Sequence, residues 1–274
     1  MRKILVTFII GDRYKNLWNK LCKKSWEYYC EKNNYELIVI DNQLENCWGG
    51  EDRGLVWQKI LLPNFYQPDD KILFLDADIV IARDAKDPMN LLEEGMIGAV
   101  HEYPTRAHNR QVRHWAGKSR IKSAAEMHLR WGKLETDVSY MINTGMLCFQ
   151  CKYAQGPFKY VWDNYGNLPY EQPPLSHHLQ KLGQWQSMAE EFNQIWWNER
   201  ISYPYMVKVD QIRLNKNYFK YIPGVMRIAN ELRFHAILNL LGRTSFLHFN
   251  PSVTFDLPLD WWERHLEFEK AGDF

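Results

Sequence analysis

The sequence predicts an α/β protein built on a mostly parallel, doubly wound sheet flanked by helices. Short apolar runs alternate along the N-terminal third with stretches whose apolar residues recur at helical spacing. The most apolar run, residues 71–82, has eight apolar residues around Asp76-Ala77-Asp78. Such a run is typical of a strand buried on both faces. Strands that alternate with helices favour parallel pairing, because a crossover helix returns the chain to the same end of the sheet.

The expected elements follow in chain order from apolar spacing and turn residues. We expect strands at residues 4–10, 36–40, 71–82, 96–101, 140–150 and 246–249. We expect helices at residues 15–32, at 55–65 with a break near Pro63, from Asp87-Pro88, around 158–162, from Glu171-Gln172 and at 225–241. No linker, repeat or low-complexity segment interrupts this order.

Length and composition exclude several classes of protein. A chain of 274 residues can bury a large core, and a net charge of +1 gives no general attraction to nucleic acid. The 12 Trp, 15 Tyr and 13 Phe are many, and flat aromatic faces suit sugar rings, although most of these side chains are expected in the core.

Cysteine usage and the N-terminus indicate a cytoplasmic protein, with peripheral contact at a membrane left open. The five cysteines are odd in number and lack framework spacing, which is typical of a reducing compartment. Cys148 and Cys151 have no second Cys pair or nearby His pair at the spacing of a zinc site, so a zinc site is not favoured. The apolar residues 4–10 resemble a short signal peptide but lack a cleavage site, so a first buried strand is favoured. No apolar run approaches the length of a membrane span.

The Asp76-Ala77-Asp78 triplet is the strongest functional signal. In an extended chain residues i and i+2 point the same way, so both carboxylates are expected on one side, at the carboxyl end of an inner strand. Two carboxylates there repel each other and lose hydration, and a divalent cation with hard oxygen ligands is the natural counter-charge. That cation would in turn hold a diphosphate. Such triplets also occur by chance, so the prediction depends on the apolar strand around this one.

Residues 103–125 form a basic stretch with two open interpretations. The stretch holds no acidic residue and six basic ones: Arg106, Arg110, Arg113, Lys118, Arg120 and Lys122. It is either a solvated helical surface or a basic flap beside a phosphate-rich substrate.

Taken in order, the motifs resemble the GT-A class of nucleotide-sugar glycosyltransferases, most closely the retaining families 8 and 34. The likeness covers roughly residues 3–250. Its components are the opening strand, Trp57-Gln58-Lys59-Ile60, Phe74-Leu75-Asp76-Ala77-Asp78, Ile142-Asn143-Thr144-Gly145, Glu171-Gln172 and His248.

This resemblance implies a metal, Mn²⁺ or Mg²⁺, held by Asp76, Asp78 and His248 together with the donor diphosphate. It also implies that residues 143–145 and Glu171-Gln172 line the sugar and acceptor pocket. Two features depart from the families. Phe-Asn-Pro-Ser follows His248 in place of the usual glycine and lysine, and Glu171 stands where Asp is more frequent.

The chemistry of sugar transfer suggests roles for these residues. A divalent ion and a cationic side chain, for which Lys59 is the candidate, would stabilise the departing diphosphate. Retention needs either a carboxylate nucleophile or same-face attack, and Glu171 is the carboxylate not committed to metal. The predicted catalytic residues are Asn143, Glu171 and Gln172. The predicted donor-binding residues are Thr7, Tyr14, Asp41, Lys59, Asp76, Ala77, Asp78, Thr144 and Gly145.

The expected organisation is one GT-A domain over residues 1–250, with a basic helical insertion at about 103–137. An aromatic and charged tail, residues 251–274, packs on or beside it. The expected partners are a UDP-sugar donor and a saccharide or glycolipid acceptor. Two alternatives stay open. A haloacid-dehalogenase-like phosphatase also opens on an Asp-x-Asp pattern, with a later acidic motif only at Asp256 and Asp260. The other is a non-catalytic sugar-binding protein.

Overall fold

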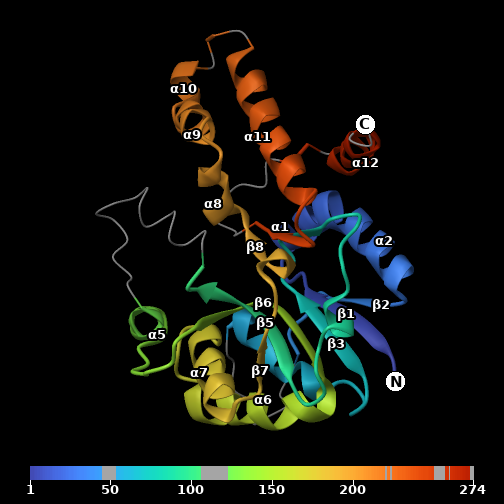
Figure 1. Cartoon of the computed structure of the whole chain (residues 1–274), viewed down its shortest axis with the longest axis vertical. Helices are drawn as coiled ribbons and strands as arrows, with labels where there is room; N and C mark the ends of the chain where they lie inside the picture. The colour runs from blue at the N-terminus through green and yellow to red at the C-terminus, as the bar shows by residue number, and fades with distance from the viewer. Residues whose placement is uncertain are drawn as a thin grey trace.

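A central sheet joins strands from both halves of the chain (Figure 1). The structure is a computed structural model that describes residues 1–44, 54–105, 123–219, 221–222, 224–249, 257–258 and 260–271. Within these residues the central sheet has six strands in the order β2-β1-β3-β6-β5-β7. Their bounds are β1 (Lys3–Phe8), β2 (Glu36–Ile40), β3 (Lys71–Leu75), β5 (Ile97–Tyr103), β6 (Met141–Gln150) and β7 (Trp185–Ser187).

The predicted fold class is confirmed, with one strand reversed. Strand β1 pairs in parallel with β2 and β3, and β5 pairs in parallel with β7. Strand β6 lies between β3 and β5 and is antiparallel to both. The sheet is therefore mainly parallel, and β6 brings its residues back across the end of β3.

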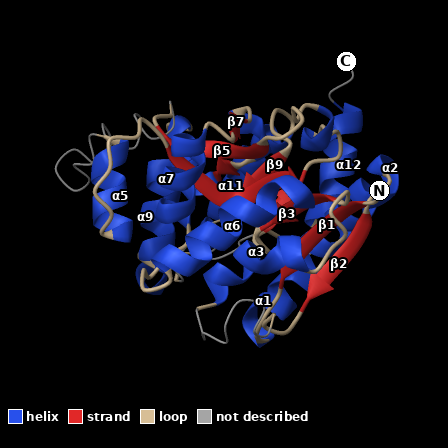
Figure 2. Cartoon of the chain, turned by 90° about the horizontal axis from the view of Figure 1, so that it is seen from below, coloured by secondary structure: helices blue, strands red, loops and turns tan. Residues whose placement is uncertain are grey.

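Helices cover both faces of the sheet because its inner strands are apolar on both sides (Figure 2). Leu73 and Leu75 belong to the core cluster that contains Trp26 of α2 (Lys23–Asn33). Ile72 and Phe74 belong to the opposite cluster, which contains Ile60 of α3 (Gln58–Leu61) and residues of α6 (Cys151–Tyr165) and α7 (Gln172–Leu182). This alternation is the period of two expected of a buried strand.

A smaller sheet of three strands forms beside the first, in the order β4-β9-β8. Strand β9 (Phe246–His248) is antiparallel to β4 (Ile79–Ile81) and parallel to β8 (Gln194–Ile195). His248 pairs with Ile79 on one side and Ile195 on the other. Strand β9, which lies near the C-terminus in sequence, is therefore held beside β4, the strand that directly follows the acidic triplet.

The remaining elements surround these sheets. They are α1 (Asp12–Leu17), η1 (Trp18–Cys22), η2 (Leu55–Trp57), η3 (Leu62–Asn64), η4 (Pro88–Asn90), α5 (Ala124–Gly132), η5 (Glu190–Phe192), α8 (Trp196–Glu199), η6 (Arg200–Ser202), α9 (Met206–Leu214), α10 (Lys216–Phe219), α11 (Val225–Leu241) and α12 (Trp261–Ala271). None of the helices in the described ranges is long and apolar enough to cross a membrane.

Three expected elements need correction. The apolar run 71–82 is not one strand, because a turn at the triplet separates β3 from β4 and the Ile79 amide donates to the Asp76 carbonyl at 3.1 Å. The helix expected from Asp87-Pro88 is only the short 3-10 turn η4. The helix expected at 15–32 begins earlier, at Asp12, and contains the π-helical turn η1.

The described part of the C-terminal tail packs on the N-terminal helices. The Trp261 indole Nε1 donates to the Leu21 carbonyl at 2.8 Å. The ring centroids of Trp262 and Tyr28 lie 5.6 Å apart. The domain boundary at residue 250 stays a prediction.

The indole of Trp26 supports the strand that follows the triplet. It is fully buried, and its Nε1 donates to the Ile79 carbonyl at 2.8 Å. Trp26→Phe removes this bond and leaves a small cavity, so we expect the free energy of unfolding to fall by roughly 1–3 kcal/mol in urea denaturation. Tyr160→Phe, at an exposed position of α6, is the control and should stay within about 0.5 kcal/mol of the parent. Equal stability of the two variants would contradict this role.

Candidate active site

The backbone of the turn Asp76-Ala77-Asp78 is hydrogen-bonded to three other segments. The Asp76 amide donates to the Gly145 carbonyl of β6 at 2.8 Å, and the Phe249 amide donates to the Asp78 carbonyl at 2.9 Å. The thiol of Cys22 donates to the Ala77 carbonyl at 3.4 Å. Because the chain turns here, the two carboxylates differ in environment. The Asp76 side chain is 32% exposed and that of Asp78 is 5% exposed.

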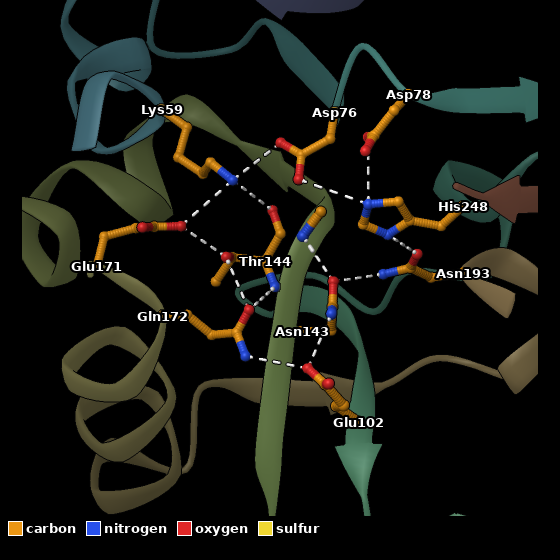
Figure 3. A network of polar contacts seen from close by, with 11 residues as sticks. Lys59, Asp76, Asp78, Glu102, Asn143, Thr144, Glu171, Gln172, Asn193 and His248 are labelled. Carbon is orange, nitrogen blue, oxygen red and sulfur yellow. Dashed lines mark hydrogen bonds and ion pairs between the residues drawn. The ribbon is translucent and has the colours of Figure 1, made fainter. Parts of the chain in front are cut away.

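His248 meets both carboxylates through the same ring nitrogen (Figure 3). Its Nε2 lies 3.2 Å from Asp78 Oδ1 and 4.0 Å from Asp76 Oδ2. One ligand atom of each residue lies within 4.8 Å of the other two. Two carboxylates and one imidazole form a donor set that suits a divalent cation. When the imidazole is neutral, it does not compensate the negative charge of the two carboxylates.

Electrostatics in the cluster favour a cation or a proton between these groups. Burial alone would lower the pKa of His248, but the carboxylates of Asp78 and Asp76 outweigh it, and the net shift is upward. Burial raises the pKa of Asp78, and the neighbouring imidazole offsets this only in part.

Lys59 supplies a second counter-charge from α3. Its buried Nζ lies 3.0 Å from Asp76 Oδ1 and 3.2 Å from Glu171 Oε1. It also donates to the Thr144 carbonyl at 3.2 Å. Burial lowers the pKa of Lys59, but the two carboxylates raise it above the ordinary value. The three donors of the ammonium are thus already directed at the protein, so Lys59 is placed to neutralise Asp76 and Glu171 rather than to meet a phosphate directly.

The start of α7 brings Glu171 and Gln172 against β6. The Thr144 hydroxyl donates to Glu171 Oε1 at 2.7 Å. The Thr144 amide donates to Gln172 Oε1 at 3.4 Å, and Gln172 Nε2 donates to Glu102 Oε2 at 3.2 Å. Glu171 is buried, with a side chain that is 4% exposed. Its carboxylate is therefore held as a fixed charge at the wall of the site.

Asn143 connects this group to the histidine. Its Nδ2 donates to Glu102 Oε2 at 3.0 Å, and its Oδ1 accepts from Asn193 Nδ2 at 2.8 Å. Asn193 Oδ1 faces His248 Nδ1 at 2.9 Å. Together with the contacts of Lys59, Thr144 and Gln172, these bonds form a closed ring of polar side chains (Figure 3).

These side chains border a cleft of about 340 Å³. Its volume is in the range of small-molecule sites. Its charged and polar lining consists of Lys59, Asp76, Asp78, Glu102, Asn143, Thr144, Glu171, Gln172 and His248. Its apolar and aromatic lining consists of Val56, Trp131, Tyr170, Pro173 and Ile195. Aromatic faces beside hydrogen-bonding groups suit a sugar ring.

Not every predicted residue lines this cleft. Thr7 is fully buried in β1, and within the described residues its hydroxyl has no hydrogen-bond partner. Asp41 is exposed after β2, 3.8 Å from Lys15 Nζ. Tyr14 is half-buried, and burial followed by the charges of Asp78 and Asp76 raises its pKa, so it lies near the acidic pair. Their roles in donor binding stay predictions.

Glu102 and Asn193 belong to the polar network but were not predicted from the sequence. Glu102 follows the apolar part of β5, and Asn193 follows the 3-10 turn η5, so neither belongs to a recognisable motif. Only the pairing of β5 with β6 brings Glu102 to the cleft, and only the pairing of β8 with β9 brings Asn193 to the imidazole of His248. The six basic side chains between 106 and 122, and Asp256, lie outside the described residues.

Solved glycosyltransferases share this architecture. A glycosyltransferase involved in glycosylation of the major capsid of PBCV-1 matches with a TM-score of 0.52 at 14% identity, over 98% of this chain and 100% of that one. The galactosyltransferase LgtC, solved with donor and acceptor sugar analogues, matches with a TM-score of 0.50 at 14% identity, over 97% and 95%. The chain has the GT-A fold.

A third solved glycosyltransferase matches over about half of its own length. The bifunctional glycosyltransferase WbbM matches with a TM-score of 0.53 at 12% identity, over 98% of this chain but 51% of that one. No family model matches the sequence, and neither does any curated protein sequence. A GT-A fold leaves the haloacid-dehalogenase-like alternative without structural support.

Gly145 lets the histidine approach β6 closely. A Cβ at this position would lie 2.6 Å from His248 Cε1 and 2.9 Å from Nδ1. Gly145→Ala should therefore push the imidazole away from the acidic pair and weaken Mn²⁺ binding by at least about tenfold in titration calorimetry. Gly156→Ala is the matched control, because a Cβ there meets nothing within 4 Å. Parent affinity in Gly145→Ala would show that the ring position does not matter for the metal.

Metal affinity should depend on pH through His248. Because the pKa of the metal-free imidazole is raised, its proton persists as the pH rises toward neutrality and must leave before a cation binds. Mn²⁺ affinity should increase with pH, by up to about tenfold per unit while one proton is displaced. Calorimetry in buffers of different ionisation enthalpy measures that proton release. Affinity that is flat between about pH 5.5 and 8 would remove His248 from the ligand set.

Proposed function

We propose that this chain is a metal-dependent glycosyltransferase that transfers a sugar from a nucleotide-diphosphate sugar, with UDP as the expected nucleotide. The observation that carries the proposal is the cluster of Asp76, Asp78 and His248 at the wall of the cleft that Glu171 and Gln172 also line. In open α/β sheets this end of the strands is where ligands bind. The likeness to solved glycosyltransferases supports the same assignment through the fold.

Mn²⁺, or Mg²⁺ in its place, would be held by Asp76, Asp78 and His248. Carboxylates suit either ion, and the imidazole favours Mn²⁺ because Mg²⁺ prefers oxygen ligands. When bound, the ion supplies positive charge that neutralises the departing diphosphate. The fit is supported by the chemistry of the three donors and by the upward shift of the His248 pKa.

The residues of the chain would prepare the site for positive charge on the sugar. Glu171 is fixed by Lys59 and Thr144, so it is poorly placed to take a proton from an acceptor hydroxyl. Its fixed negative charge would instead stabilise an oxocarbenium-like transition state, which agrees with a retaining reaction. Asn143 and Gln172, tied through Glu102, would border the sugar.

The acceptor is proposed to be a saccharide or a glycolipid. Tyr170 and Trp131 line the cleft and offer aromatic surfaces for a sugar ring. LgtC was solved with donor and acceptor sugar analogues, which supports a site for two saccharide ligands in this fold.

The decisive experiment compares nucleotide-sugars with a phosphatase substrate. In thermal-shift assays with Mn²⁺, the correct donor at about a hundred times its dissociation constant should stabilise the protein by about 2.7 kcal/mol. Metal-dependent turnover of that donor should fall by more than about a hundredfold in Asp76→Ala and in Asp78→Ala. Turnover of p-nitrophenyl phosphate instead would favour a phosphatase, and donor binding without turnover a sugar-binding protein.

The role of Glu171 is tested by removing its charge alone. Glu171→Gln keeps size and hydrogen bonding, so kcat should fall far more than KM rises, by about a hundredfold. Proton NMR of the product, formed from an α-linked donor, reports the anomeric configuration. A β-linked product would discard retention and make Glu171 a candidate general base.

A further inference from the structure

We propose that Asn193 is a positioning residue that determines which ring nitrogen of His248 faces the acidic pair. A neutral imidazole carries its proton on one nitrogen only, and a ligand nitrogen must be the bare one. His248 Nε2 faces Asp76 and Asp78, while Nδ1 faces Asn193 Oδ1 at 2.9 Å. With the oxygen of the Asn193 amide held toward the ring, Nδ1 of the neutral imidazole donates to it. The proposal is that this bond outweighs the attraction of the Asp78 carboxylate, 3.2 Å away, for a proton on Nε2.

The orientation of that amide is fixed by its other neighbours. Asn193 Nδ2 donates to Asn143 Oδ1 at 2.8 Å. The backbone N–H of Gly145, which can only donate, points at the same oxygen at 2.8 Å. On the far side, Asn143 Nδ2 donates to the carboxylate of Glu102 at 3.0 Å. Both ends of the Asn143 amide therefore require the same orientation, with Oδ1 toward the Gly145 N–H and Nδ2 toward Glu102. Asn193 must then direct its Nδ2 at Asn143 and its Oδ1 at the imidazole.

Burial makes this relay effective. Asn193 is 4% exposed, Asn143 is 7% exposed and His248 is 7% exposed, so water has little access to replace a lost partner. Asn193 contacts the imidazole but does not line the main cleft, whereas Asn143 and His248 do line it. The assignment of the tautomer does not rest on the proposed function, whereas its consequence for metal binding does.

The experiment reads the tautomer directly. Long-range ¹H–¹⁵N NMR of metal-free protein with labelled histidine, at alkaline pH where the ring is neutral, should place the His248 proton on Nδ1. Asn193→Leu removes the acceptor oxygen and should give a substantial population protonated on Nε2. Asn193→Asp keeps an acceptor toward the ring, at some cost because its second oxygen faces Asn143 Oδ1, and should retain the parent tautomer.

Mn²⁺ affinity provides the second readout. It should fall by about 10–100-fold in Asn193→Leu and stay closer to the parent in Asn193→Asp. A parent protein with its proton on Nε2 would overturn the proposal without any variant. So would Asn193→Leu with the parent tautomer and affinity. A parent with the expected tautomer but no Mn²⁺ binding would instead refute the proposed function and leave the positioning role intact.

A second, independent observation concerns the projecting helices. Figure 1 shows α9, α10 and α11 extending away from the central sheet. Large apolar and aromatic side chains near their far end are exposed, and we define the hairpin tip as Tyr218, Tyr221, Ile222 and Ile228, at 72%, 77%, 47% and 59% exposure.

The charge of this segment indicates what covers the tip. Residues 205–232 hold five basic residues, Lys208, Arg213, Lys216, Lys220 and Arg227, against two acidic ones. Both acids are ion-paired with arginines outside the segment, Asp210 with Arg200 and Glu231 with Arg264. Exposed tyrosines and isoleucines in a segment whose sequence has an excess of basic residues suit the headgroup region of an anionic bilayer. We infer that the hairpin tip docks on an anionic lipid surface.

Vesicle co-sedimentation tests this inference. The protein should bind phosphatidylglycerol-containing vesicles, bind pure phosphatidylcholine vesicles at least about tenfold less, and release as salt increases. Replacing Tyr218, Tyr221 and Ile222 by Ser should abolish binding. Leu91→Ser with Leu182→Ser, exposed apolar positions outside the hairpin, is the matched control and should bind as the parent does. Absence of binding, equal binding by the tip variant, or a tip-dependent dimer in sedimentation would overturn the docking surface.

Discussion

Carboxylate crowding at the end of β3 is the constraint on which the rest of the site depends. Asp76, Asp78 and Glu171 lie at one wall of a cleft, two of them buried, where unpaired charge would be costly. The chain places Lys59 between Asp76 and Glu171, and His248 between Asp76 and Asp78. Two basic groups against three acids still leave a negative site, which attracts a cation.

The fold serves this constraint by bringing distant segments to one point. The triplet separates β3 of the large sheet from β4 of the small one, so both sheets end at the acidic pair. Strand β6 runs against its neighbours and delivers Asn143, Thr144 and Gly145 beside the triplet. Strand β9 delivers His248 from near the C-terminus, and Gly145 has no side chain to obstruct it.

A closed ring of hydrogen bonds and ion pairs gives the site its rigidity. The polar side chains of Lys59, Thr144, Gln172, Glu102 and Asn193 each have a partner on another element. Groups oriented before a substrate arrives need not reorganise as charge develops, which is how fixed dipoles lower barriers. If one amide in such a ring were reversed, its neighbours would also have to exchange donor and acceptor. A substitution at one member is therefore expected to change the hydrogen bonds of members that it does not contact.

The sequence by itself determined most of the strands, several helices and the acidic triplet, because apolar periodicity and turn residues are local properties. It did not predict the short strands β7 and β8 or the helices α8, α9, α10 and α12. It also marked His248 and Glu171-Gln172, though only through a resemblance in motif order. It misplaced the triplet on a continuous strand, since a turn between two buried strands leaves apolar periodicity on both sides intact. It contained no local signal for Glu102 or Asn193, and none for the contacts of Lys59 with two carboxylates. Only the tertiary structure could decide these, because hydrogen-bond partners far apart in sequence are set by strand pairing and not by any local pattern.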